Sequence, residues 1–250
     1  MYFWHRLKNW YYTRNLKNKD LHPCIKEYLR CFEEFDINKP ISEIQFTVFD
    51  SETTGLDCKK GDRIVSLSAV RLKNGRIDLS DVFHELVNPD RDIPSRSVLV
   101  HEILPNMVDS KPGIENILPD FIKFIGSSVL VAHHGWLDMS FLNKEMMRLY
   151  SLPIRNYMVD TAVLDKIFQS KTTPYAVGMA GDYSSALNDM AKRYNVCVEE
   201  LHSSFWDATI TAQIFQQMIK SVQQQGVVTL KDFLKYVENK NRFKLTGSPV

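Results

Sequence analysis

The sequence predicts an α/β protein built on a mixed five-stranded sheet that is flanked by helices. Three strand patterns follow one another between residues 43 and 87, and helical patterns then alternate with two further strands up to residue 160. Such alternation is typical of α/β folds. The dipeptide Asn74-Gly75 predicts a tight hairpin between the second and third strands. That pair must therefore be antiparallel, and the sheet cannot be doubly wound.

The strands are predicted from short runs of alternating or continuous apolar residues. The first strand lies at residues 43–50, and the hairpin pairs residues 62–73 with residues 76–87. Residues 127–134 are apolar enough to form a buried strand, and residues 156–160 predict the last one. The expected sheet is an antiparallel meander followed by parallel strands, because helices separate the later strands.

Helical periodicity begins after Pro94 and dominates the second half of the chain. Apolar residues recur there at intervals of three and four, as on the buried face of a helix that packs against a sheet. The predicted helices cover residues 97–104, 114–126, 137–150, 161–168, 185–194, 206–222 and 230–241.

Residues 1–40 differ from the rest and predict an amphipathic helical extension to a main domain of residues 41–250. Aromatic and aliphatic residues from Phe3 to Tyr11 recur at helical spacing among basic residues, and residues 24–35 predict a second helix. The favoured interpretation is that this extension packs on the main domain. Its basic residues leave open contact with nucleic acid or with an anionic membrane surface.

Composition excludes several classes of protein. The chain has 44% hydrophobic and 24% charged residues with a net charge of +1, which is typical of a globular protein and unlike an extended duplex-DNA-binding surface. Its 4 cysteines lack zinc-ligand spacing, which favours reduced thiols. No segment reaches the roughly 18 apolar residues of a membrane span, and the N-terminus lacks a secretory signal. We therefore expect a cytoplasmic protein.

The stretch FDSETTG, residues 49–55, places two carboxylates at the end of the first predicted strand. Side chains two residues apart on a strand project from the same face, so Asp50 and Glu52 are expected to lie side by side. Two unpaired carboxylates repel each other, and a divalent cation removes that penalty. Oxygen ligands without Cys or His favour Mg²⁺ or Mn²⁺ over zinc. An isolated pair of this kind is more often a solvated strand end.

Two later segments add acidic residues at predicted helix starts. Asp138 follows a buried strand and opens a helix, and Asp207 lies in the first turn of another helix, after His202. Considered singly, each acid is explained by the favourable interaction of a negative charge with a helix N-terminus. Ser203 or Ser204 is expected to cap the second helix.

In this order, the three segments resemble the motifs of the DEDDh 3′→5′ exonucleases. The first motif is similar to Asp50-x-Glu52-Thr53-Thr54-Gly55, the second to the surroundings of Asp138 in VAHHGWLDMSFL, and the third to His202-x-x-x-x-Asp207. The resemblance covers residues 44 to about 220. The tyrosine branch of the superfamily has Tyr where this chain has Ser203, so His202 indicates the histidine branch. The resemblance implies a ribonuclease H-like fold and stepwise hydrolysis of nucleic acid.

The resemblance also implies roles for individual residues. Two Mg²⁺ or Mn²⁺ ions would be held by Asp50, Glu52, Asp138 and Asp207. His202 would be the base that takes a proton from the attacking water, a task suited to imidazole, whose ordinary pKa is about 6.5. The terminal nucleotide of the substrate would be bordered by Thr53, Gly55, Leu56, His101 and His134. Asp160, which also recurs in the family, is interpreted as a helix cap.

Two positions depart from the family pattern. The family usually has Asn at the position of His134 and Phe at that of Leu137, which puts the details of substrate contact in doubt. His133 and His134 are not expected to form a zinc pair, because adjacent residues of a strand point to opposite faces. Phe205 and Trp206 are expected in the core, although such a pair can also stack bases.

The sequence thus predicts a metal-dependent exonuclease that removes mononucleotides from single-stranded 3′ ends of DNA or RNA. A ribonuclease that trims RNA tails is an alternative, because carboxylates that hold metal do not read the 2′-hydroxyl. A non-catalytic module that binds nucleic acid or a polymerase is a second alternative, but it predicts a lost acid or histidine, and none is lost. A proofreading role would require a polymerase subunit in trans.

Overall fold

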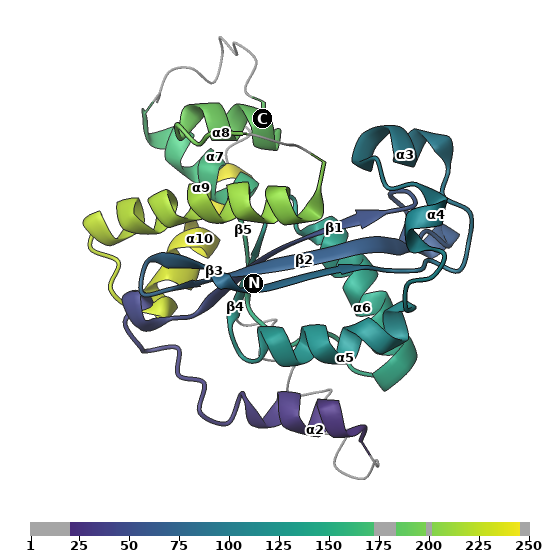
Figure 1. Ribbon diagram of the computed structural model, residues 1–250. Coiled ribbons are helices and arrows are strands. Elements are labelled where there is room, and N and C mark those ends of the chain that lie inside the picture. Colours follow the sequence, from purple (N-terminus) through teal and green to yellow (C-terminus); the bar gives the residue numbers. More distant parts are fainter. Residues whose placement is uncertain (1–20, 173–183, 199–201, 246–250) are drawn as a thin grey trace.

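A computed structural model describes residues 21–172, 184–198 and 202–245, and its centre is one five-stranded sheet (Figure 1). The strand order is β3-β2-β1-β4-β5, with β1 in the middle. β1 pairs antiparallel with β2 and parallel with β4, and β5 extends the parallel half. The mixed sheet predicted from the sequence is therefore confirmed. The strands are β1 (Phe46–Thr53), β2 (Ile64–Lys73), β3 (Arg76–Leu86), β4 (Val129–Ala132) and β5 (Met158–Asp160).

The hairpin between β2 and β3 turns at the predicted dipeptide. Asn74 and Gly75 both have positive φ, 51° and 71°, as the two central residues of a type I′ turn require. Lys73 and Arg76 are paired directly beside the turn. Asn and Gly adopt this backbone at low cost, so the local sequence fixes the register of the hairpin.

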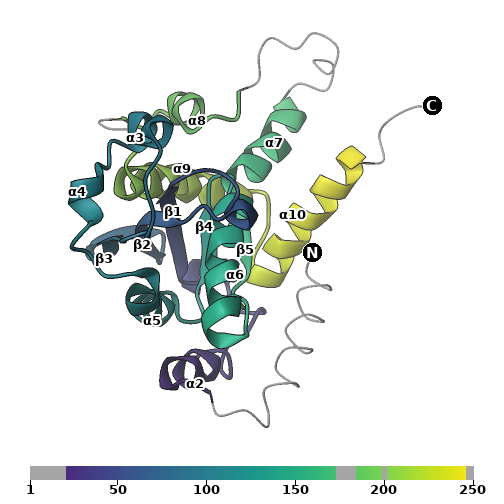
Figure 2. The same cartoon turned by 90° about the vertical axis from the view of Figure 1, so that its right-hand side faces the viewer.

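One face of the sheet is covered by α7 (Thr161–Thr172), α8 (Leu187–Arg193), α9 (Ser204–Gln224) and α10 (Leu230–Leu245). The long helix α9 lies across β1 and β2 (Figures 1 and 2). Its apolar side chains, among them Ile214 and Phe215, are buried against Phe46 and Val48 of β1. Burial of such side chains supplies most of the stability of a helix in a protein.

The opposite face carries α5 (Ile114–Ile125) and α6 (Trp136–Tyr150), with α2 (Pro23–Arg30) packed on α5. Phe49 of β1 belongs to this second core, together with Phe121 and Leu142. Successive residues of β1 thus enter different cores, as the alternation of a strand requires. The short helices α3 (Ser95–His101) and α4 (Pro105–Val108) lie at one end of the sheet (Figure 1).

The described part of the N-terminal extension packs on the main body. Its helix ends at Arg30, earlier than the predicted residue 35, and begins at Pro23, whose fixed φ suits a first helical turn. Ile25 and Tyr28 are buried in the core beside α5. Tyr28 donates a hydrogen bond to Asn156 Oδ1 at 2.6 Å. The predicted amphipathic segment before residue 21 lies outside the described residues.

Residues 37–41 are tied to the segment before α10 by backbone hydrogen bonds. Ile41 N–H donates to the Val228 carbonyl at 2.8 Å, and Lys231 N–H donates to the Ile37 carbonyl at 2.8 Å. The segment between α2 and β1 is therefore fastened to the start of α10. All four cysteines are free thiols, as predicted. None of the helices in the described ranges is long and apolar enough to cross a membrane.

Candidate active site

Asp50 and Glu52 lie on the face of β1 that α9 covers. They continue the row of Phe46 and Val48, which pack against α9, because alternate residues of a strand share a face. Phe46 and Val48 in this row are part of the core. Asp50 and Glu52 follow where β1 extends beyond the core. The predicted shared face of the two carboxylates is thus confirmed.

Asp207 reaches the same place from the first turn of α9. One carboxylate oxygen from each of Asp50, Glu52 and Asp207 lies within 4.8 Å of the other two. Residues more than 150 positions apart in the sequence are therefore brought together at the end of β1, where α9 begins. We refer to these three residues as the acidic triad.

Asp138 approaches from the other side of β1, in the first turn of α6. Its Oδ1 atom accepts hydrogen bonds from the backbone N–H of Ser51 at 3.0 Å and from the Ser51 hydroxyl at 2.5 Å. Its carboxylate is not one of the three that converge within 4.8 Å. It is nevertheless close enough for its charge to raise the pKa of Asp50 and of Glu52.

Burial disfavours the ionised form of all four acids, and the charges of neighbouring acids add to this effect at Asp50 and Glu52. Burial, followed by the charges of Asp138, Glu52 and Asp207, raises the pKa of Asp50 well above its ordinary value. Burial and the same kind of repulsion raise the pKa of Glu52 to about 8. Burial raises the pKa of Asp138 and of Asp207 to about 6 each. Without a cation, the site therefore holds protons near neutral pH.

The donor set suits a hard divalent cation. Oδ1 of Asp207 is buried and has no hydrogen-bond partner among the described residues. An unsatisfied buried acceptor is costly, and a bound cation would satisfy it. Carboxylate oxygens are the ligands that Mg²⁺ and Mn²⁺ prefer, and no Cys or His joins the triad in the described part of the chain.

His202 lies immediately before α9, at the exposed edge of the site. Its φ is +64°, a left-handed conformation that is uncommon for residues other than Gly and that His, like Asn and Asp, adopts more readily than most. Both its backbone and its charge lie near Asp207, since each lowers the pKa of that carboxyl group and opposes the effect of burial. His202 is therefore accessible from solvent and adjacent to the acidic triad.

Comparison with known proteins agrees with this geometry. A family model described as "Exonuclease", of the RNase T type, matches residues 47–215. The chain belongs to this exonuclease family. A DNA polymerase III subunit epsilon-like protein of Rhodobacter capsulatus is 34% identical over 205 residues, which are 81% of this chain and 28% of that protein. A PolC-type DNA polymerase III of Staphylococcus haemolyticus is 31% identical over 207 residues, 83% of this chain and 14% of that protein.

The chain thus spans less than a third of the length of these curated relatives. Solved structures share its fold. Exonuclease X, in complex with 5′ overhanging duplex DNA, has a TM-score of 0.52 and 23% identity, and the match covers 70% of this chain and 92% of that one. The nuclease domain of 3′hExo, a DEDDh family member bound to rAMP, has a TM-score of 0.57 and 16% identity, covering 72% and 93%. These exonucleases have the ribonuclease H-like fold that the sequence predicted.

In this member of the family, the loop after β1 is held by a buried polar contact. A Cβ atom at Gly55 would collide with the carboxylate of Asp62, so only glycine permits this approach. Asp62 Oδ2 accepts a hydrogen bond from the N–H of Asp57 at 3.0 Å. Thr53 donates its hydroxyl proton to the Gly55 carbonyl at 2.6 Å. Leu56, by contrast, is 76% exposed, which makes it available to a ligand.

His101 is the last residue of α3, beside the backbone of Thr53, and does not lie in a loop. It is buried, its Nδ1 atom accepts from the Ile103 N–H at 3.1 Å, and its Nε2 atom has no partner among the described residues. Burial lowers the pKa of His101, an effect that the backbone of Thr53 partly offsets. The Ser97 hydroxyl donates to the Thr54 carbonyl at 2.8 Å, so α3 is fastened to the first motif.

The expectation that His133 and His134 point to opposite faces is wrong. β4 ends at Ala132, and His134 has a φ of +53°, so the two residues are not on a strand. Their rings lie 4.5 Å apart between centroids. His133 contacts the Thr161 hydroxyl at 3.0 Å, and no third metal ligand joins the two histidines in the described ranges. Asp160 caps α7, as predicted, by accepting from the Ala162 N–H at 2.9 Å.

The expected capping of α9 by a serine side chain is also wrong. Ser203 is the N-cap residue, but its side chain makes no capping hydrogen bond. Phe205 packs against the core, as predicted, and its ring also contacts Trp206 at a centroid distance of 5.4 Å. Sequence reasoning missed Ser51, which anchors Asp138, because nothing local marks a hydrogen bond between residues 87 positions apart.

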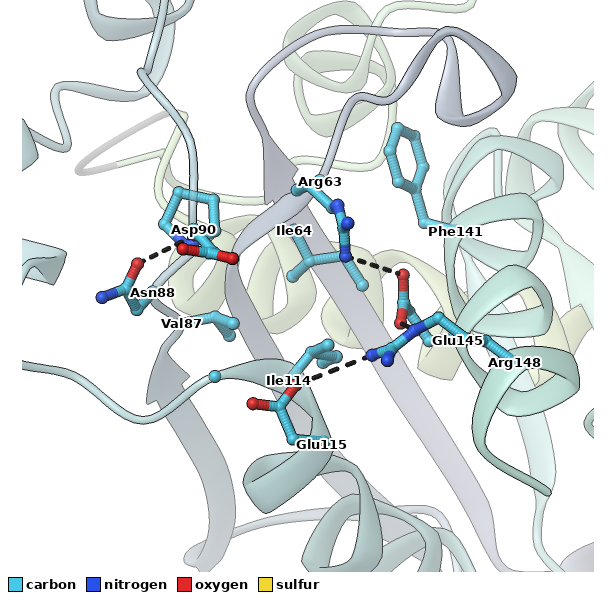
Figure 3. Close-up of a pocket in the computed structure, with 12 residues that line it drawn as sticks. Arg63, Ile64, Val87, Asn88, Asp90, Ile114, Glu115, Phe141, Glu145 and Arg148 are labelled. Carbon is cyan, nitrogen blue, oxygen red and sulfur yellow. Dashed lines mark hydrogen bonds and ion pairs between the residues drawn. The ribbon is translucent and has the colours of Figure 1, made fainter.

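A separate hollow of about 440 Å³ lies between β2, α5 and α6 (Figure 3). Arg63 points into it toward the buried Glu145, at 3.6 Å, and Arg148 Nε donates to Glu145 at 2.6 Å (Figure 3). Arg148 also lies 3.6 Å from Glu115. Three carboxylates and two guanidinium groups line this hollow, so it offers no excess positive charge to a phosphate. None of the acidic triad lines it.

Proposed function

We propose that this chain is a 3′→5′ exonuclease that hydrolyses phosphodiester bonds at single-stranded ends of nucleic acid and releases 5′-mononucleotides. The observation that carries the proposal is the acidic triad. Three half-buried carboxylates from β1 and α9 converge within 4.8 Å, and burial together with the neighbouring carboxylates raises the pKa of Asp50 and of Glu52. A purely structural site would pair such charges.

Asp50, Glu52, Asp138 and Asp207 are proposed to hold two Mg²⁺ or Mn²⁺ ions. A bound pair of such ions would activate a water molecule and stabilise charge on the leaving 3′ oxygen. β1 and α9 hold the three triad carboxylates in place, while Ser51 fixes the orientation of Asp138 through two hydrogen bonds. The buried Oδ1 atom of Asp207, which has no hydrogen-bond partner among the described residues, is proposed to be one of the metal ligands.

His202 is proposed to take the proton from the attacking water. It is exposed, it adjoins Asp207, and its place before α9 gives the imidazole room to reorient when substrate binds. After the bond is broken, the proton leaves to solvent from the exposed ring.

The residues around the triad are proposed to contact the terminal nucleotide. Thr53 at the end of β1 and Gly55 in the following loop are joined by a hydrogen bond and are proposed to lie beneath the nucleotide. Leu56 presents an exposed apolar side chain beside them. His101 lies behind Thr53, and its unpartnered Nε2 atom can donate to or accept from a sugar or a backbone group that arrives there. His134, held near α8 by a 3.3 Å contact of Nε2 with Ser185, borders the second motif.

Single-stranded DNA is the proposed substrate class, and a polymerase subunit in trans is the proposed partner. The names of the curated relatives, an epsilon-like protein and PolC-type polymerases, support both proposals. A trimming activity on RNA is the second candidate, because 3′hExo was solved with rAMP. The carboxylates contact phosphate and metal in either case, so only substrate competition separates the two.

Digestion of matched strands tests the activity. DNA and RNA oligonucleotides of one sequence, labelled at the 5′ or the 3′ end, are incubated with Mg²⁺, Mn²⁺ or EDTA. The expected result is progressive shortening from the 3′ end, 5′-mononucleotide products, and no reaction in EDTA. A 3′-phosphate should slow the reaction. Cleavage of circular single strands, or products shortened from the 5′ end, would overturn the proposal.

A further inference from the structure

A row of hydroxyl groups lies on the same face of the sheet as the acidic triad. Ser68 is the cross-strand neighbour of Asp50, and Ser66 is the neighbour of Glu52. Directly opposed residues in an antiparallel pair point to the same face, so both serines face α9. His84 of β3 is the next residue outward from Ser68 in the register.

Ser204 of α9 joins this row. Its hydroxyl oxygen lies 2.7 Å from the Ser66 hydroxyl and 2.6 Å from the Ser68 hydroxyl, and all three side chains are buried. Ser68 in turn lies 2.7 Å from Nδ1 of His84. Three hydroxyl protons suffice for these three bonds when each serine donates once, so the chain of hydrogen bonds is complete.

The position of Ser204 gives this contact its importance. Ser204 is the first residue of α9, and Asp207 follows three residues later, on the same side of the helix. The charge of Asp207 raises the pKa of Glu52, so the two carboxylates repel each other across the gap between helix and strand. The helix start has no side-chain cap that would hold it against this repulsion.

We propose that Ser204, Ser66, Ser68 and His84 are positioning residues that fix the first turn of α9 on β2 and thereby set the distance between Asp207 and the carboxylates of β1. The proposal rests on the function proposed above, since it assumes that these carboxylates bind metal together. His84 closes the chain at the surface, where its ring contacts Phe205 of α9 at a centroid distance of 5.9 Å. No hydroxyl of the row touches the reacting atoms.

The test measures Mn²⁺ binding by calorimetry without nucleic acid, together with melting temperature. Ser204→Ala and Ser68→Ala should each weaken Mn²⁺ binding about 10-fold, as loss of a residue that orients metal ligands does. The matched control is Ser128→Ala. Ser128 is also buried and loses two hydroxyl contacts, with Thr47 at 2.7 Å and the Ile125 carbonyl at 2.7 Å, on the α5 side of the sheet. It should lower the melting temperature without changing Mn²⁺ affinity.

The Ser68→Ala/Ser204→Ala double variant should bind Mn²⁺ no more weakly than Ser204→Ala, because Ser204→Ala already removes both bonds between α9 and β2. If Ser204→Ala does not fold, the Ser66→Ala/Ser68→Ala variant breaks both bonds to Ser204 from the sheet. If Mn²⁺ affinity falls in step with melting temperature in all three single variants, including the control Ser128→Ala, the inference is overturned. Wild-type protein that binds Mn²⁺ but releases no mononucleotides would instead overturn the proposed function and leave this inference standing.

Discussion

Asp207 combines several properties that are energetically unfavourable in one side chain. Its carboxylate is largely buried, burial raises its pKa to about 6, and Oδ1 has no hydrogen-bond partner among the described residues. Groups of this kind destabilise a protein unless a ligand satisfies them, and they concentrate at functional sites. The same residue should therefore oppose folding in the absence of metal and support function in its presence.

Replacement of Asp207 by Asn separates these two effects. Asp207→Asn removes a buried negative charge from beside Glu52, so the metal-free variant should melt at a higher temperature than the metal-free wild type. It should also lose most of the stabilisation by Mg²⁺ and nearly all hydrolysis. Thermal melts in EDTA and in Mg²⁺ measure both. Asp189→Asn, at a partly exposed carboxylate of α8 outside the site, is the matched control and should leave hydrolysis and the stabilisation by Mg²⁺ unchanged. An Asp207→Asn variant with normal turnover would contradict the ligand role.

His202 makes a second prediction at this scale. If its imidazole takes the proton from water, His202→Asn should lower turnover about 10²–10⁴-fold while Mn²⁺ affinity stays nearly unchanged. Asn is the better substitute than Ala because it tolerates the φ of +64° that this residue adopts. The acidic limb of the pH–rate profile should also change, because protonation of the metal-binding carboxylates is then its remaining cause. A loss of metal affinity would make His202 a ligand, and full activity would place the base elsewhere.

At the scale of the element, α2 shows how far the extension is part of the fold. Tyr28 is buried, donates to Asn156 at 2.6 Å, and accepts from the Arg155 N–H at 2.8 Å. Tyr28→Phe removes these two bonds, which should lower the free energy of unfolding by about 1–3 kcal/mol. Chemical denaturation measures the loss.

Tyr28 lies on the α5 side of the sheet, away from the carboxylates, so kcat of the folded variant should equal that of the wild type. Cys31→Ala, an exposed change one residue beyond α2, serves as the control and should be neutral. A fall in kcat at unchanged stability would show that α2 takes part in substrate binding. Packing on the main domain would then not be the sole role of α2.

Local patterns predicted the elements well where one signal dominated. Asn74-Gly75 fixed the hairpin, and the parity of β1 placed Asp50 beside Glu52. Predictions were wrong where tertiary contacts overrode local preference. Ser203 does not cap α9, because the neighbouring Ser204 bonds to β2 and secures the helix start in another way. His134 leaves the extended conformation at the end of β4, which no residue pattern announced.

The candidate site was predictable for a related reason. Its acids lie at element ends, and sequence order alone identified the resemblance that grouped them. The residues that orient these acids were not predictable, since Ser51 and Ser204 act through partners 87 and 136–138 positions away. Serine has no preference that reveals such a role, and only the strand register brings these groups together.

For the whole molecule, the site is a concentration of negative charge inside a chain that is nearly neutral overall. The two cores hold this charge in place from opposite faces of the sheet: α9 carries Asp207 on one face, and α6 carries Asp138 on the other. Global stability should therefore depend on how the four carboxyl groups titrate. Metal and protons are then competing ligands of the folded state.

The sign of the pH dependence follows from the raised pKa values. In the unfolded chain these carboxyl groups lose their protons near pH 4, whereas the folded protein retains them until about pH 6 at Asp138 and Asp207 and about pH 8 at Glu52. Between these limits the unfolded state binds fewer protons. The contribution of the site to the free energy of unfolding therefore falls as pH rises through this range.

Denaturant unfolding in EDTA and in Mg²⁺, at about pH 5.5 and about pH 8.5, measures this dependence. In EDTA, the wild type should be less stable at the higher pH than the Asp50→Asn/Asp207→Asn variant, and the two should converge at the lower pH. Mg²⁺ should stabilise the wild type chiefly at the higher pH, because only ionised carboxylates bind it. Equal stabilisation by Mg²⁺ at both values, or in both proteins, would show that the metal binds elsewhere.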